Sequence, residues 1–305
     1  MLSVVIPSYN EEKMKPETAE TIGSILTGAG KEYELIFVDD GSKDGTWSAI
    51  CEESEKDSGV VGLHFSRNFG KEAAMFAGLE RAKGDCVAVI DCDLQHPPEK
   101  LCEMYALWKD GYEVVEGVKE DRGMESGMHR FAANAFYGII SGLTGMDMAN
   151  ASDFKLLDRK VVDTLNNMPE RSVFFRALSH WVGFKTASVS YCVRERTAGE
   201  SKWSTKALIK YALTNISSFS AAPLQLVTWL GVAFLVFALV LGVQTIVRYV
   251  GGTALEGFTT VILLILISAG LIMVSLGIIG FYIAKIYDEI KGRPRYIISE
   301  ERRKR

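Results

Sequence analysis

The chain has 305 residues and a formal net charge of −4 at pH 7. This length allows one sizeable α/β domain with an additional segment, and the acidic balance gives no footprint for a nucleic-acid partner. The five cysteines show no C-x-x-C spacing and lie in apolar or helical contexts. We therefore expect reduced structural thiols in the cytosol.

Residues 1–118 alternate between short apolar runs and segments of helical period. The runs rich in β-branched residues predict strands at Leu2–Pro7, Tyr33–Asp40, Val60–Phe65, Cys86–Asp93 and Tyr112–Val118. Helices are expected between strands, for example at Thr46–Lys56, Lys71–Lys83 and Glu99–Lys109. Strands that alternate with helices form parallel sheets, so the pattern predicts an α/β domain with a mostly parallel, Rossmann-like sheet.

Polar residues follow these strands at the edge where open α/β sheets bind ligands. The first strand ends in Pro7–Glu12, the second in Asp39–Ser42 and the fourth in Asp91–Gln95. A turn followed by a helix cap explains Asp44–Thr46. It does not explain Asp39 and Asp40, the two adjacent carboxylates before that turn. One of them can accept hydrogen bonds from a base or a ribose.

The spacing Asp91-x-Asp93 after an apolar strand predicts a divalent cation site. Carboxylate oxygens suit Mg²⁺ or Mn²⁺, and such an ion also bridges the phosphates of a nucleotide. Acidic residues often end strands for purely structural reasons, which is the alternative for a bare D-x-D. The strand before it and Gln95 two residues later favour the metal site.

The pattern changes in the second part of the chain. Met124–Leu143 and Arg159–Asn166 are predicted to be amphipathic helices, and Ala187–Val193 a further strand. Trp203–Ser218 carries two lysines, directly follows Lys202 and has an apolar face. That combination predicts a helix that lies in a membrane interface.

Two long uncharged runs follow, from Tyr211 to Val247 and from Gly257 to Ala284. About 20 apolar residues cross a bilayer as a helix, so residues 224–247 and 261–284 are predicted to form a transmembrane hairpin. Buried core helices are the alternative, but such helices rarely stay uncharged for so long.

Basic residues set the predicted orientation of the hairpin. Residues 285–305 hold eight basic side chains, against the single Arg248 in the connecting loop. By the positive-inside rule both termini are cytoplasmic. The basic tail is expected to bind anionic lipid headgroups. The alternative is that its charges only increase the solubility of this end of the chain. The predicted parts are residues 1–202 as the cytoplasmic α/β domain, 203–223 as the interfacial helix, 224–284 as the hairpin and 285–305 as the tail.

Four ordered motifs resemble the inverting GT-A glycosyltransferases of family 2 that act on polyprenyl phosphates, such as bactoprenol glucosyltransferases and dolichol-phosphate mannose synthases. The motifs are Val5–Glu12, Val38–Ser42, Ser66–Glu72 and Asp91–Pro97, and the resemblance continues through Gly199–Trp203, the hairpin and Gly292–Pro294. It implies a GT-A fold with metal-dependent transfer of a hexose from a nucleotide sugar to undecaprenyl or another polyprenyl phosphate. UDP-glucose is the first expected donor and UDP-N-acetylglucosamine the second. The resemblance also implies a homo-oligomer, a tetramer, in the inner membrane.

The resemblance also assigns site residues by position. The nucleotide-sugar contacts are Pro7, Tyr9, Glu11, Asp39, Asp40, Lys71 and Asp91; the metal ligands are Asp91, Asp93 and Gln95; the acceptor and phosphate contacts are Arg130, Arg196, Ser201 and Lys202. For Lys71, which starts a helix, a solvated surface lysine is the alternative.

Asp153 matches a family carboxylate that lies near the acceptor and is proposed as base, so Asp153 and Asp93 are the expected catalytic residues. A phosphate acceptor is already ionised at neutral pH, so Asp153 can instead orient the acceptor or a basic neighbour. One position departs from the family, because Glu116-Gly117-Val118 stands where relatives commonly place an arginine. Lys119, Arg122 or Arg130 would then supply that phosphate contact.

Two other functions stay open. A processive polysaccharide synthase shares the early motifs, but the chain lacks the Gln-x-x-Arg-Trp motif and the further spans of that class. A non-catalytic membrane scaffold is disfavoured by the intact Asp91, Asp93 and Gln95. His64 and His96 are expected to be a strand residue and a turn residue rather than ligands.

Overall fold

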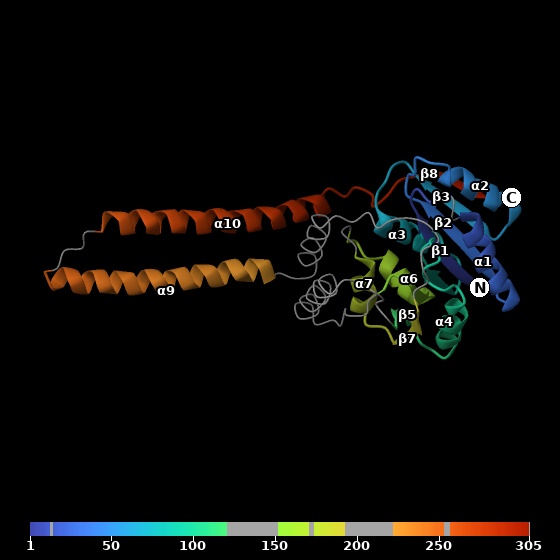
Figure 1. Cartoon of the computed structure of the whole chain (residues 1–305), viewed down its shortest axis with the longest axis horizontal. Helices are drawn as coiled ribbons and strands as arrows, with labels where there is room; N and C mark the ends of the chain where they lie inside the picture. The colour runs from blue at the N-terminus through green and yellow to red at the C-terminus, as the bar shows by residue number, and fades with distance from the viewer. Residues whose placement is uncertain (13–14, 121–151, 171–173, 193–221, 253–256, 305) are drawn as a thin grey trace. The chain divides into compact units, whose positions relative to one another are not determined.

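The computed structural model describes residues 1–12, 15–120, 152–170, 174–192, 222–252 and 257–304. The chain divides into two compact units, Met1–Ser204 with Arg293–Arg305 and Thr205–Gly292. The first is an α/β unit and the second contains two long helices (Figure 1).

The described residues of the α/β unit form an eight-stranded sheet in the order β7-β5-β6-β4-β1-β2-β3-β8. Its strands are β1 (Leu2–Ser8), β2 (Tyr33–Asp39), β3 (Val60–Phe65), β4 (Cys86–Val89), β5 (Val114–Lys119), β6 (Lys155–Asp158), β7 (Thr186–Tyr191) and β8 (Ile298–Arg303). The four strands β1 to β4 pair in parallel, as the sequence predicts, and β5 pairs in parallel with β7. The antiparallel pairs are those that β6 makes with β4 and β5, and that β8 makes with β3.

Helices cover both faces of this sheet. They are α1 (Lys15–Gly28), α2 (Thr46–Lys56), α3 (Lys71–Arg81), α4 (Lys100–Lys109), α6 (Arg159–Asn166) and α7 (Phe175–Trp181). Side chains alternate along a strand, so Leu2, Val4 and Ile6 point to one face, where they share a core with α1, α2 and α4. Val5 points to the other face, against α3, where a Cβ at Gly78 would lie 2.1 Å from the Val5 Cγ1. This close approach fixes α3 on the sheet, with Lys71 at its first turn.

The strand β3 and the helices α2 and α6 have the predicted bounds, and the other predicted elements that the structure describes differ by a few residues at their ends. The helices predicted at Met124–Leu143 and Trp203–Ser218 lie outside the described residues. Strand β6 and helix α7 were not predicted. β6 is only four residues long, and Lys155 at a fully buried position interrupts its apolar pattern.

Arg293–Arg305 belongs to the α/β unit, whereas the prediction placed residues 285–305 together in a separate basic tail. β8 extends the sheet beside β3, Glu301 pairs with Arg81 at 2.7 Å, and Tyr296 stacks on Phe65 with ring centroids 5.1 Å apart. All six residues of β8 are exposed. Because backbone pairing to an edge strand needs no buried side chains, the charged sequence gave no strand signal.

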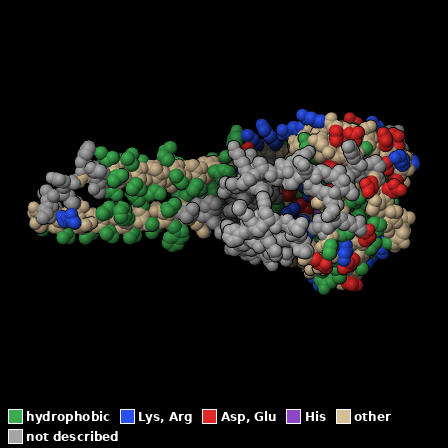
Figure 2. Space-filling model, in the orientation of Figure 1, with side chains coloured by type: hydrophobic (Ala, Val, Ile, Leu, Met, Phe, Trp, Pro, Cys, Tyr) green, Lys and Arg blue, Asp and Glu red, His purple; other side chains and the backbone are tan. Residues whose placement is uncertain are grey.

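The second unit contains α9 (Ala222–Val250) and α10 (Phe258–Ile290). Within them Val227–Arg248 and Val261–Ile290 are long and apolar enough to cross a membrane. Figure 2 shows hydrophobic side chains along both helices, whereas charged side chains gather over the α/β unit. These two helices correspond to the predicted hairpin, and α10 continues six residues beyond the predicted end at residue 284.

Candidate active site

The carboxyl ends of β1, β2 and β4 meet at one edge of the sheet, because these strands are parallel neighbours. The loop after β1 is tied to the loop after β2: the Asn10 N–H donates to the Ser42 hydroxyl at 2.9 Å, and the Glu11 N–H donates to the Thr46 hydroxyl at 2.9 Å. Tyr9, directly before Asn10, is 44% exposed. The structure therefore brings the predicted nucleotide residues of both loops to a common edge.

Asp39 and Asp40 are buried and are engaged within the protein. Asp39 Oδ2 lies 2.8 Å from His64 Nδ1, and Asp40 accepts hydrogen bonds from the N–H groups of Phe69 at 2.6 Å and Gly70 at 2.9 Å. Burial raises the pKa of Asp40 above its usual value although both N–H groups oppose it. In this arrangement Asp40 holds the loop after β3 against the loop after β2, and Asp39, the last residue of β2, is tied to His64 of the neighbouring strand β3.

The D-x-D segment follows β4, and both of its carboxylates are partly exposed. Asp93 Oδ1 accepts a hydrogen bond from the Gln95 N–H at 3.1 Å. Leu94 between them has φ 53°, a left-handed conformation that is uncommon for a leucine. Backbone strain of this kind occurs at ligand sites, where the surrounding structure maintains it.

These residues fit a hard divalent cation. Mg²⁺ is commonly held by one or two carboxylates while phosphates and water complete its coordination. Two accessible carboxylates, Asp91 and Asp93, are available at this strand end. Within the described ranges no group of three or more His, Cys, Asp or Glu side chains is placed to hold a metal ion. Two carboxylates fit a cation that a phosphate ligand and water also coordinate.

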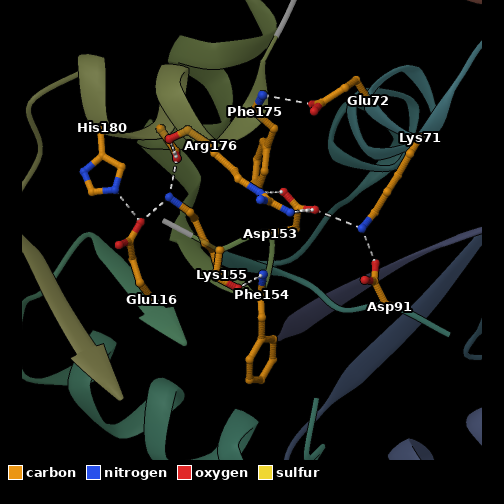
Figure 3. A network of polar contacts seen from close by, with 12 residues as sticks. Lys71, Glu72, Asp91, Glu116, Asp153, Phe154, Lys155, Phe175, Arg176 and His180 are labelled. Carbon is orange, nitrogen blue, oxygen red and sulfur yellow. Dashed lines mark hydrogen bonds and ion pairs between the residues drawn. The ribbon is translucent and has the colours of Figure 1, made fainter. Parts of the chain in front are cut away.

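Lys71 connects the D-x-D segment to Asp153. Its Nζ lies 2.7 Å from Asp91 Oδ1 and 2.9 Å from Asp153 Oδ2 (Figure 3). Burial lowers the pKa of Lys71, but the two carboxylates outweigh it and hold the pKa above its usual value. The side chain is 43% exposed and yet doubly ion-paired, which argues against the alternative of a solvated surface lysine.

Arg176 of α7 binds Asp153 from the opposite side. Its Nε lies 2.7 Å from Asp153 Oδ1, and its Nη2 lies 2.8 Å from Oδ2, which is the two-point geometry of an arginine fork. Burial alone would raise the pKa of Asp153, but Lys71 and Arg176 hold it far below its usual value. Asp153 is thus ionised at neutral pH and is a poor proton acceptor in this state.

Arg176 was not among the residues predicted from the sequence. The only signal was a charge inside the apolar run Phe174-Phe175-Arg176-Ala177-Leu178, whose neighbouring residues are buried. Glu72 next to Lys71 also belongs to this region, because its carboxylate accepts a hydrogen bond from the Phe175 N–H at 2.9 Å. Burial, with a contribution from Asp153, raises the pKa of Glu72 to about 7.

The remaining predicted residues divide into two groups. Arg130, Arg196, Ser201 and Lys202 lie outside the described residues, as does Arg122. Glu116, at the position of the expected family arginine, is buried and forms an ion pair with Lys155. It therefore belongs to the interior of the protein rather than to an open phosphate contact.

The two histidines near the site have structural contacts, as expected. His64 is a residue of β3 that pairs with Asp39. His96 stacks on Phe154 with centroids 5.0 Å apart, and burial lowers its pKa.

Comparisons with known proteins give the family and the fold of the chain. The chain is 39% identical over 304 residues to the uncharacterized glycosyltransferase YkcC of Bacillus subtilis, covering 98% of this chain and 93% of YkcC. It is 37% identical over 300 residues to the prophage bactoprenol glucosyl transferase homolog of Escherichia coli, covering 98% of both. Among solved structures, glucosyl-3-phosphoglycerate synthase of Mycobacterium tuberculosis with Mn²⁺, uridine diphosphate and phosphoglyceric acid gives a TM-score of 0.51 at 19% identity. That match covers 71% of this chain and 78% of the synthase, and it supports the GT-A fold.

Residues 3–165 match the family described as Glycosyl transferase family 2. This match contains the strand-end loops, the D-x-D segment, Lys71 and Asp153. Together with relatives that align over nearly the whole chain, it shows that the protein is a member of glycosyl transferase family 2.

Proposed function

We propose that this protein transfers a hexose from a nucleotide sugar to a polyprenyl phosphate, with UDP-glucose as the first candidate donor and UDP-N-acetylglucosamine as the second. The relatives named as bactoprenol glucosyl transferases support the lipid acceptor and the glucosyl group. In the structure, the proposal depends most on Lys71, which contacts both Asp91 of the D-x-D segment and Asp153.

The proposed reaction is a single displacement at the anomeric carbon. An acceptor phosphate oxygen forms the new bond from one face, the bond to the nucleoside diphosphate breaks on the other, and the electron pair leaves with the diphosphate. The configuration therefore inverts. The acceptor is already ionised, so the reaction needs no strong base, which agrees with an Asp153 whose pKa is held far below its usual value.

Positioning and charge would supply most of the acceleration. Lys71 and Arg176 are two cations whose charges are balanced by Asp91 and Asp153. An arriving phosphate can share these cations with the carboxylates, and Asp153 would keep both oriented during transfer. Asp153 is then an orienting anion in the proposal, in place of the base implied by the family resemblance.

A divalent cation, Mg²⁺ or Mn²⁺, would be held by Asp91 and Asp93 with Gln95 beside them, and when bound it offsets the charge that develops on the leaving diphosphate. The backbone of the D-x-D segment keeps these side chains in place for the cation. Asp93 is tied to the Gln95 N–H at 3.1 Å, and the left-handed Leu94 fixes the turn between them.

The two apolar helices support a membrane location for the acceptor. α9 and α10 contain stretches of 22 and 30 residues that are long enough to span a bilayer. We propose that they anchor the enzyme in the inner membrane with the α/β unit on the cytoplasmic side, where a lipid phosphate reaches a soluble nucleotide sugar.

The test is transfer of radiolabelled sugar from a panel of UDP- and GDP-sugars to undecaprenyl phosphate, with Mg²⁺ or Mn²⁺ and with a chelator as control. The proposal predicts a lipid-linked product from one donor, lost on chelation. If nucleotide binds but no donor gives a lipid product, the acceptor assignment is wrong.

A further inference from the structure

Helix α7 presents one polar face to the site. The side chains of Arg176, Ser179 and His180 carry its polar contacts, and their spacing places them on one side of the helix, while the Phe175 backbone N–H makes a further one. Their partners come from α3, the segment before β6, β6 itself and β5 (Figure 3). The helix is thus held from several elements at once, although it is only seven residues long.

A buried ion pair lies under this face. Lys155 is fully buried, and its Nζ contacts the Glu116 carboxylate and donates to the Ser179 hydroxyl at 2.6 Å. Glu116 and Lys155 stand directly opposite each other in the antiparallel register of β5 and β6. His180 Nε2 lies 3.0 Å from the Glu116 carboxylate. A buried charge that loses its partner is strongly destabilising, so the ion pair fixes β5 against β6. Ser179 and His180 attach α7 to this pair.

The same contacts reach Asp153 through Arg176. The Ser179 hydroxyl accepts from Lys155 and donates to the Arg176 carbonyl at 3.0 Å. The Arg176 guanidinium then binds Asp153, which precedes Lys155 by only two residues. Ser179 and Lys155 thus hold the Arg176 backbone on one side and the chain next to Asp153 on the other.

We propose that Glu116, Lys155 and Ser179 are positioning residues of the transferase, which fix Arg176 on Asp153 without touching a substrate. The inference rests on the proposed function of Asp153 as the orienting anion. It gives Glu116 a role of its own: this residue anchors the Arg176–Asp153 pair through Lys155, where the family resemblance implied a phosphate-binding arginine.

The test uses neutral isosteres in the full-length protein. Lys155→Met or Glu116→Gln alone leaves one buried charge without its partner and lowers the unfolding temperature. The double variant removes both charges, so much of that stability returns. We expect its kcat for sugar transfer to stay lowered by about 10- to 100-fold while the donor KM changes less than about twofold, because transfer is sensitive to small misplacements. A purely structural ion pair predicts that kcat recovers together with stability.

Ser179→Ala gives a second variant that keeps the Glu116–Lys155 ion pair and removes the hydroxyl that links Lys155 to the Arg176 carbonyl. It should lower kcat without raising the donor KM. Lys160→Met is the matched control, because Lys160 pairs with Glu113 at an exposed position and should leave transfer unchanged. Wild-type kcat in Ser179→Ala, or in a stable double variant, would overturn the inference. Absence of lipid product from the wild type would instead overturn the proposed function.

Discussion

The α/β unit holds two pairs of carboxylates in different ways. Asp39 and Asp40, here called the loop carboxylates, contact an imidazole, the Ser42 hydroxyl and three backbone N–H groups. Asp91 and Asp153, the ion-paired carboxylates, contact the cations of Lys71 and Arg176. One pair thus maintains backbone conformation, and the other maintains the positions of charged groups. The loop carboxylates hold the loop conformation, whereas the ion-paired carboxylates keep two cations at the sheet edge where a phosphate can share them. We expect the two pairs to fail differently on mutation.

The largest effect is expected at Asp91. Asp91→Asn removes a proposed cation ligand and a partner of Lys71, so sugar transfer should fall by about 10³-fold. Addition of a chelator to the wild type should give a loss of similar size. The measurement is the rate of lipid-linked product formation at saturating donor, and undiminished transfer with chelator would remove the metal from the account.

Asp153→Asn should lower turnover by about 10²-fold, because Arg176 and Lys71 lose the anion that orients them. Donor affinity should change little, since the substitution leaves the loop carboxylates intact. Parallel measurements of turnover and of UDP affinity check this separation. Near-normal turnover would place Asp153 outside the site.

The loop carboxylates should affect stability more than chemistry. Asp40→Ala leaves two buried N–H groups, those of Phe69 and Gly70, without their acceptor. The free energy of unfolding should fall by about 2–4 kcal/mol. Denaturant unfolding in detergent measures it, with Asp40→Asn as the control that keeps one oxygen acceptor. An Asp40→Ala protein as stable as the wild type would contradict this role.

Glu72 gives a pH test within the region of the ion-paired carboxylates. Its folded pKa of about 7 exceeds the ordinary 4.5, so the folded state binds this proton more tightly than the unfolded chain. The stabilisation is complete below about pH 4.5 and is lost as the pH rises through 7. Glu72→Gln should therefore flatten the dependence of unfolding free energy on pH over this interval. An unchanged slope would show that other groups cause it.

The smallest effect is expected where β8 joins the sheet. Arg81 and Glu301 form a partly exposed ion pair at 2.7 Å. Such pairs contribute about 0–1 kcal/mol, so Arg81→Ala should change the unfolding free energy by no more than this and leave transfer unaffected. A larger loss would mean that the pair, rather than the backbone pairing of β8, holds the C-terminal strand.

The fold was predictable where local sequence decides it. β3 and α2 have their predicted bounds because an unbroken apolar run and a clear helical period mark them. The charged, exposed β8 and the four-residue β6 depend on pairing with distant strands, which leaves no local pattern.

The candidate site also has a part that local sequence predicts and a part that depends on distant contacts. The carboxylates at strand ends were predictable because parallel strands bring their carboxyl ends to one edge. The partners of those carboxylates were not. Lys71 and Asp153 are 82 positions apart, and Asp153 and Arg176 are 23 apart, so their contact depends on how α3 and α7 pack. Glu116 stands where relatives commonly place an arginine. Its role became clear only from its cross-strand neighbour Lys155, which the sequence alone does not identify.

The most direct test of the account is single-turnover sugar transfer by Lys71→Met. Lys71 is the contact common to Asp91 and Asp153, and Lys56→Met is a matched control, because Lys56 pairs only locally with Glu53 at an exposed position. The account predicts that Lys71→Met folds normally and loses transfer by about 10²-fold, while Lys56→Met transfers at the wild-type rate. Wild-type transfer by a folded Lys71→Met protein would contradict the claim that the ion-paired carboxylates and their shared cation form the reaction centre.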